Sequence, residues 1–154
     1  MRPIDYFDRG VTKDPNGVFV KGTERSYKFS EAKDLTFKIA QGLNKKGFEK
    51  GDSVAVYAPN DPAAVVCIFS IFRASGIWIP VNTRNDVSSN AQYLTYVSTK
   101  WLFFHSSVIN EVKEIAPKLT EIKRIFCLDS SATDFPYVQE IFSDYEEEFL
   151  SDQS

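Results

Sequence analysis

Few residues of this chain have the type and spacing that catalysis or metal binding requires. The single histidine, His105, has no second histidine with which to form a metal site. It lies at the end of a predicted strand, so we interpret it as structural rather than as a catalytic base. Carboxylate pairs at useful spacing, such as Glu146 and Glu148, occur only in the C-terminal segment, which has no clear periodicity. We therefore expect neither a catalytic residue nor a metal site within these 154 residues.

The glycines do not form a phosphate-binding loop. They occupy positions 10, 17, 22, 42, 47, 51 and 76, a spacing from which no GxGxxG motif can be built. Gly51 is followed by Asp52, whereas a phosphate-cradling loop needs Lys and then Ser or Thr. No serine occupies a GxSxG motif either. The chain is thus not expected to be catalytically active by itself.

The segment FRASGIWIPVNTR, residues 72–84, places a cation after a predicted buried strand. Pro80 has no N–H to donate and ends the strand's pairing. Parallel α/β folds bind ligands at the C-terminal ends of their strands, and a guanidinium group suits a phosphate ligand. Arg84 is therefore the candidate binding residue. The alternatives are that it pairs with a nearby carboxylate such as Asp86, or that it faces solvent.

The elements that must position this segment alternate between strand and helix. A hairpin is predicted at about residues 17–29, followed by a helix capped by Ser30. The predicted strands are 54–59, 77–81, 101–105 and 124–129, and the helices between them are about 62–75, 89–100 and 109–119, with Pro117 bending or ending the last. Apolar strands separated by single helices are typical of parallel βαβ units. We predict a three-layer α/β fold with a mostly parallel sheet of about four or five strands.

Several polar and aromatic residues in these elements have structural interpretations. Asn60 and Asp61 fit a turn and a helix cap ahead of Pro62. Asn82 is expected to satisfy loose backbone groups at the end of its strand. Phe69 and Trp78, which could form the wall of a ligand pocket, are interpreted as core residues.

Charge and composition exclude several classes of partner. Residues 137–154 carry six acids and no Lys or Arg, which we interpret as a solvated helix or a fraying tail. Residues 1–136 hold 15 acids against 18 bases, too weak a charge to indicate a nucleic-acid partner. The apolar run 63–72 is too short to span a membrane, and the N-terminus does not fit a secretory signal. Cys67 and Cys127 belong to no CxxC pair and indicate buried, reduced thiols in a cytoplasmic protein.

The order of motifs resembles the N-terminal part of the adenylate-forming superfamily, the acyl-CoA synthetases and their relatives. An aromatic-rich hairpin leads into an S/T-Y-x-E-L helix start, followed by a G-x-x-x-G-D-x-V-A turn and strand, a P-N corner, and an A-G-A-x-x-x-P-x-N-x-R segment. The matching residues are Tyr27, Phe29, Ser30, Glu31 and Ala32; Gly47, Gly51, Asp52, Val54 and Ala55; Pro59 and Asn60; and Ala74, Gly76, Pro80, Asn82 and Arg84, with Ser75 as an extra residue. Asn85 replaces the family's usual leucine. The resemblance covers about residues 6–128.

The resemblance implies a fragment of a longer enzyme. Residues 1–130 correspond to its N-terminal subdomain, and 131–154 to a loop and acidic tail at a point of truncation. The full enzyme would convert a carboxylic acid and ATP into an acyl-adenylate, then transfer the acyl group to CoA, with Mg²⁺ balancing the phosphate charge. The phosphate loop and catalytic lysine of the family have no counterpart here. The resemblance implies that Arg84 contacts the phosphates of CoA, and that this fragment binds none of these cofactors tightly.

Two alternatives remain open at this level. The chain can be a stand-alone, non-catalytic interaction module, or part of an adenylation domain that loads a carrier protein, in which case Arg84 meets no CoA. The partners expected of a fragment are the downstream subdomains of the same polypeptide and the acid substrate. A fragment also leaves an apolar face uncovered, so self-association is expected.

Overall fold

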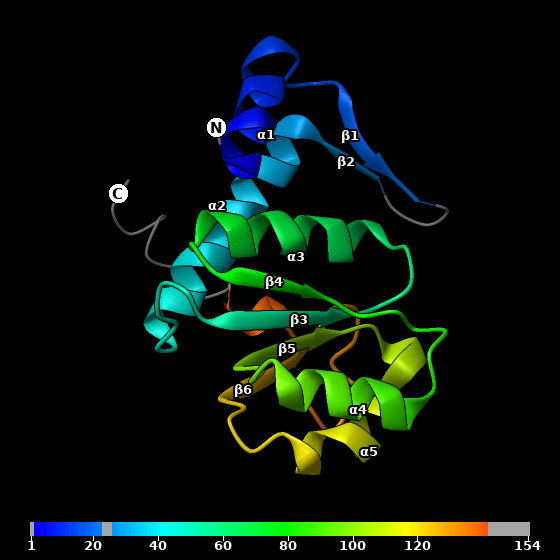
Figure 1. The fold of residues 1–154 in the computed structure, drawn as a ribbon. Coiled ribbons are helices and arrows are strands. Elements are labelled where there is room, and N and C mark those ends of the chain that lie inside the picture. Colours follow the sequence, from blue (N-terminus) through cyan, green and yellow to red (C-terminus); the bar gives the residue numbers. More distant parts are fainter. Residues whose placement is uncertain (1, 23–25, 142–154) are drawn as a thin grey trace.

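The computed structural model describes residues 2–22 and 26–141 and contains a parallel sheet between helices (Figure 1). The strands are β3 (Ser53–Tyr57), β4 (Ile77–Pro80), β5 (Trp101–Phe104) and β6 (Arg124–Cys127), in the order β4-β3-β5-β6. All three pairings are parallel. The predicted α/β class and mostly parallel sheet are confirmed, with four strands in this part of the chain.

Helices cover both faces of this sheet. On one face lie α2 (Phe29–Lys45) and α3 (Pro62–Arg73), and on the other α4 (Val87–Tyr96) and α5 (Ile109–Ile115). Alternate strand residues separate the two cores: Val54 and Val56 belong to the first, Ala55 and Tyr57 to the second. Short 3₁₀ turns, η1 (Ser106–Val108) and η2 (Ala116–Lys118), flank α5. The second contains Pro117, which ends the α-helix early as predicted.

The N-terminal part contains the predicted hairpin and an unpredicted helix. Strands β1 (Val18–Lys21) and β2 (Ser26–Lys28) pair antiparallel. Before them, α1 (Pro3–Lys13) buries Ile4, Phe7 and Val11, which are three and four residues apart. The ring of Phe7 lies 5.0 Å from that of Phe69 on α3. This explains how α3, which is apolar on nearly all sides, is covered beyond the sheet.

The predicted helix starts were wrong at two places. The helix predicted from Ser30 begins at Phe29, with Lys28 as N-cap and Glu31 accepting the Lys28 N–H at 3.1 Å. The helix predicted from Ser89 begins at Val87 and ends at Tyr96, and its N-cap is Asp86. At both helix starts a carboxylate three residues away along the chain accepts a backbone N–H. A serine hydroxyl is therefore not needed as the acceptor. The predicted Asp61 cap is confirmed, since its carboxylate accepts the Ala63 N–H at 2.9 Å.

Two residues, Ser75 and Gly76, allow the chain to leave α3 and enter β4. Ser75, the extra residue of the motif, has a left-handed backbone with φ of 63°. Gly76 then lies against the sheet, where an added Cβ would come within 2.6 Å of the Phe48 ring and 3.3 Å of the Asp52 carbonyl oxygen. The glycine therefore allows close packing, while the reversal of the chain occurs at Ser75.

The packed part of the chain extends past residue 130. Cys127 and Tyr137 form a parallel bridge, and Val138 and Ile141 are buried in the first core. Of the six acids predicted to form a tail, five lie in residues 142–154, outside the described residues, and Glu140 is exposed.

Candidate functional site

The sheet has a topological switch point at the C-terminal ends of β3 and β5. The chain leaves β3 for α3 on one face and leaves the neighbouring β5 for α5 on the other face (Figure 1). Open α/β sheets bind ligands in the crevice at such a point. The loops that follow β3, β4, β5 and β6 are therefore the candidate site, and they contain Arg84, His105 and Asp129.

Arg84 lies in a tight turn after β4. The Asn85 N–H donates to the Asn82 carbonyl at 3.2 Å and closes the turn. The Arg84 N–H donates to Asn82 Oδ1 at 2.9 Å, which confirms that Asn82 satisfies backbone groups here. The Arg84 side chain is exposed, and within residues 2–22 and 26–141 its guanidinium has no hydrogen-bond or ion-pair partner.

The predicted alternative partner of Arg84 is engaged elsewhere. Asp86 accepts the Ser89 N–H at 2.6 Å and the Ser89 hydroxyl at 3.1 Å, as the N-cap of α4. These bonds, the backbone one above all, lower the pKa of the Asp86 carboxyl. Asp86 therefore stabilises the helix start and leaves the Arg84 guanidinium available to a ligand.

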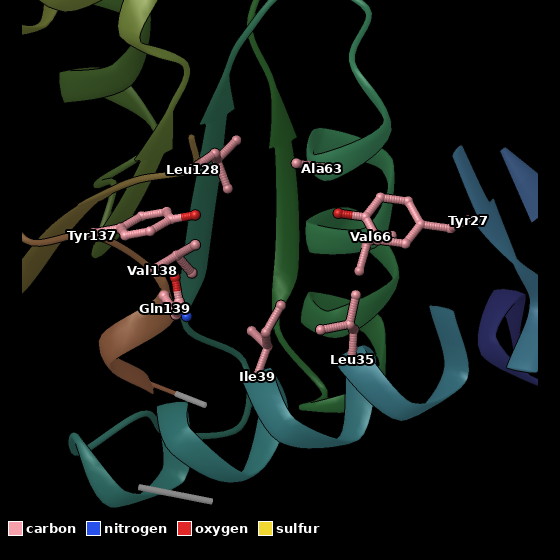
Figure 2. Close-up of a pocket in the computed structure, with 9 residues that line it drawn as sticks. All are labelled: Tyr27, Leu35, Ile39, Ala63, Val66, Leu128, Tyr137, Val138 and Gln139. Carbon is pink, nitrogen blue, oxygen red and sulfur yellow. The ribbon is translucent and has the colours of Figure 1, made fainter. Parts of the chain in front are cut away.

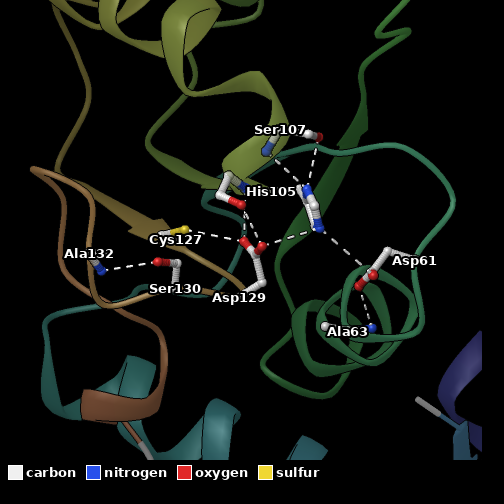
Figure 3. A network of polar contacts seen from close by, with 9 residues as sticks. Asp61, Ala63, His105, Ser107, Cys127, Asp129, Ser130 and Ala132 are labelled. Atoms are coloured by element: carbon white, nitrogen blue, oxygen red, sulfur yellow. Dashed lines mark hydrogen bonds and ion pairs between the residues drawn. The ribbon is translucent and has the colours of Figure 1, made fainter. Parts of the chain in front are cut away.

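His105 belongs to a polar network between the ends of β5, β6 and α3 (Figure 3). Its Nδ1 accepts the Ser107 N–H at 3.1 Å, so the ring hydrogen is on Nε2. Nε2 lies 3.3 Å from Asp129 Oδ2 and 4.0 Å from Asp61 Oδ2. Both nitrogens therefore have structural partners, which favours the interpretation of His105 as a residue that joins loops.

Asp129 anchors this network. It accepts the Ser106 N–H at 2.8 Å and the Ser106 hydroxyl at 2.6 Å, and Cys127 Sγ lies 3.4 Å away. Burial alone would raise the pKa of Asp129, but the Ser106 bonds and the neighbouring His105 outweigh it and lower the pKa. In the part of the chain that the structure describes, no group of three or more Asp, Glu, His or Cys side chains is arranged to hold a metal ion.

The two cysteines are buried and free, as predicted. Neither side chain has exposed surface, and burial raises the pKa of both thiols, most strongly for Cys67. A thiol with a raised pKa is a poor nucleophile. Neither cysteine is a candidate for catalysis.

A pocket of about 120 Å³ lies between α2, α3 and the segment after β6 (Figure 2). Its walls are mostly apolar, and the hydroxyl groups of Tyr27 and Tyr137 point toward its centre. The lining residues are Tyr27, Leu35, Ile39, Ala63, Val66, Leu128, Tyr137, Val138 and Gln139. Phe69 and Trp78 do not line it. Phe69 packs on Phe7 at the first core, as expected. The interpretation of Trp78 as a core residue was wrong, since it contacts Phe72 but is 36% exposed on the edge strand β4.

The fold and this site define a parallel α/β domain with a candidate binding crevice at its switch point. The AMP-binding enzyme family matches residues 7–151, and the chain belongs to this family. A peroxisomal benzoate–CoA ligase of Arabidopsis thaliana is 28% identical over 107 residues, which cover 70% of this chain and 18% of that protein. A peroxisomal butyrate–CoA ligase of the same plant is 26% identical over 125 residues, covering 81% and 21%.

The fold of a solved ligase is closely similar. Coronafacic acid ligase of Pectobacterium brasiliense matches with a TM-score of 0.85 at 17% identity, over 93% of this chain and 29% of that chain. The chain spans about one fifth of the length of the curated relatives it matches. Among the described residues, no helix is long and apolar enough to cross a membrane.

Proposed function

We propose that this chain is the N-terminal subdomain of an ATP-dependent acyl-CoA synthetase and is inactive alone. Its family membership and the short span relative to its relatives support this proposal. The ATP, Mg²⁺ and carboxylic acid would bind mainly to downstream subdomains of the same polypeptide. The chain described here would supply scaffold, and at most one ligand contact.

The free guanidinium of Arg84 is the observation that supports a role for this chain in ligand binding. It stands on a closed turn at the C-terminal edge of the sheet, next to the switch point, and Asp86 is occupied by Ser89. A planar guanidinium binds phosphate oxygens through two parallel hydrogen bonds. We propose that Arg84 binds the phosphates of the CoA nucleotide.

The experiment compares the full-length enzyme with its Arg84→Ala variant. We expect the KM for CoA to rise about tenfold, which corresponds to the free energy of one charge-assisted hydrogen bond. Carboxylate-dependent ATP–pyrophosphate exchange should be unchanged. Arg124→Ala is the matched control, because Arg124 is also exposed but begins β6 at the opposite edge of the sheet. An unchanged KM for CoA in Arg84→Ala would show that Arg84 does not bind CoA.

The proposal of a fragment is tested separately, by the reading frame and by activity. We expect the frame to continue past Ser154 into a glycine-rich Ser/Thr loop, and only the longer polypeptide to form acyl-CoA. A stop codon at that point would favour a stand-alone module. Transfer of the acyl group to a carrier protein but not to CoA would favour a carrier-loading adenylation domain.

We also propose a cytoplasmic location, supported by the two free, buried thiols. Both plant ligases reported above are peroxisomal by name, so the peroxisome is the alternative compartment. Imaging of the tagged full-length protein distinguishes the two.

A further inference from the structure

Asn90 is a buried amide whose position is not explained by packing. It lies on the sheet-facing side of α4, where Ala91 and Leu94 are also buried, and is only 2% exposed. Burying a side-chain amide is unfavourable unless its polar atoms are hydrogen-bonded. The Asn90 Nδ2 donates to the Tyr57 hydroxyl at 3.0 Å and to the Asn82 carbonyl at 3.1 Å.

These two bonds connect the Arg84 turn to the rigid part of the sheet. Tyr57 is the last residue of the central strand β3 and is 1% exposed. The Asn82 carbonyl also accepts the Asn85 N–H, so both of its lone pairs are used within the described structure. The Asn82 side chain holds the Arg84 N–H. The backbone around Arg84 is therefore fixed from α4 and β3, while its side chain stays free.

We propose that Asn90 is a positioning residue for phosphate binding by Arg84. By holding the Asn82 carbonyl, its amide keeps the turn of residues 82–85 in one conformation, so that less conformational entropy is lost when the guanidinium binds. Asn90 itself would not contact the ligand. This inference rests on the proposed role of Arg84 in CoA binding.

The test is a double-mutant cycle in the full-length enzyme with Asn90→Leu and Arg84→Ala. Leucine keeps the branched shape of the side chain, although it is larger, and removes both donors. We expect the KM for CoA to rise about threefold to fivefold with kcat and pyrophosphate exchange unchanged. In the Arg84→Ala background Asn90→Leu should have no further effect, because the two residues act through one contact.

Thr99→Val is the control for a purely structural role. Thr99 is also 2% exposed and donates a buried hydrogen bond to the Leu94 carbonyl at 2.8 Å, at the end of the same helix, but it has no bond to the turn. We expect it to lower thermal stability without changing the KM for CoA. Asn90→Ala, which removes the same donors, is a second variant if Asn90→Leu does not fold.

A readout independent of activity uses the 154-residue chain itself. Asn90→Leu should speed hydrogen exchange of the Arg84 and Asn85 amides by about tenfold relative to the wild type, since the turn loses its anchor. Thr99→Val should leave these two amides unchanged.

The outcomes separate the two proposals. If Arg84→Ala raises the KM for CoA but Asn90→Leu does not, or if the two effects add, the positioning role of Asn90 is wrong and that of Arg84 stands. If Arg84→Ala has no effect on the KM, the role of Arg84 is wrong and the role of Asn90 falls with it. Unchanged Arg84 and Asn85 exchange in Asn90→Leu would contradict the anchoring itself.

Discussion

The carboxylate of Asp52 joins three parts of the chain. It is 8% exposed and accepts hydrogen bonds from Trp101 Nε1 at 2.9 Å, Lys123 Nζ at 3.0 Å and the Glu49 N–H at 3.1 Å. This is the aspartate of the G-x-x-x-G-D motif, and its contacts give that motif a structural reason. It lies before β3, at the edge of the sheet opposite to the Arg84 turn.

We predict that Asp52→Asn lowers the free energy of unfolding by about 2 kcal/mol, since a buried bond to a charged group is lost. Lys123 loses the carboxylate at 3.0 Å and keeps the more distant one of Glu49 at 3.9 Å. Urea unfolding followed by the fluorescence of Trp101 measures this change. Asp134→Asn is the control, because Asp134 is largely exposed and, within residues 2–22 and 26–141, pairs only with Lys113. Its effect should be within about 0.5 kcal/mol of zero.

The same contacts predict how stability depends on pH. Burial alone would raise the pKa of Asp52, but its bonds to Trp101, Glu49 and Lys123 outweigh it and lower the pKa. A carboxyl with a lowered pKa in the folded state stabilises the protein above its unfolded pKa of about 4, and this contribution is lost as the pH falls below that value. Asp52→Asn should therefore show a smaller loss of stability between neutral and acid pH than the wild type. An equal loss would contradict the prediction.

At the scale of elements, helix α2 packs closely on the segment that follows β6. Gly42 is buried in α2, and an added Cβ would come within 2.8 Å of the Ile141 carbonyl oxygen. In an exposed helix Gly→Ala is stabilising by about 0.5–1 kcal/mol. Here a backbone atom stands in the way, and the helix or the segment must move.

We predict that Gly42→Ala is destabilising by about 1–3 kcal/mol, because the overpacking exceeds the gain in helix propensity. Thermal unfolding by circular dichroism measures this, and Gln41→Ala at the neighbouring exposed position is the control. A stabilising Gly42→Ala would show that residues 137–141 do not pack on α2 in solution.

The helices also show what local pattern can predict. The spacing of Ile4, Phe7 and Val11 marks α1 in the sequence, yet its charged neighbours and short length obscured it. At α4, Ser89 fits the cap rules as well as Asp86, the N-cap in the structure. At α2 the N-cap is Lys28, which makes no side-chain cap bond and which residue preference does not indicate. A cap is chosen by the path of the preceding chain, and periodicity does not contain that path.

At the scale of the whole molecule, β4 is an edge strand with exposed apolar side chains. Ile77 is 55% exposed and Trp78 is 36% exposed. The Ile77 N–H donates inward to the Asp52 carbonyl at 2.9 Å, so alternation turns the Trp78 N–H outward, and Pro80 has none to offer. An edge with so few free donors disfavours addition of a strand and leaves side-chain contact as the route to association.

We predict that the 154-residue chain self-associates through these side chains, and that Ile77→Lys weakens the association. Sedimentation velocity over a range of concentrations measures it, with Gln41→Lys as a control that adds the same charge at an exposed site on α2. A wild-type chain that stays monomeric would contradict the prediction and favour a stand-alone module.

Several features could be predicted from the sequence, because they depend on neighbours a few residues apart. They are the alternation of strands and helices, the hairpin, the buried cysteines and the order of motifs that marks the family. It also singled out Arg84 and the backbone role of Asn82. The contacts of Asn90 with Tyr57 and Asn82 could not be predicted and are seen only in the tertiary structure. The same holds for the contacts of Asp52 with Trp101 and Lys123. Those contacts exist because the strand order β4-β3-β5-β6 brings distant loops to the same edge of the sheet, and no local pattern encodes that order.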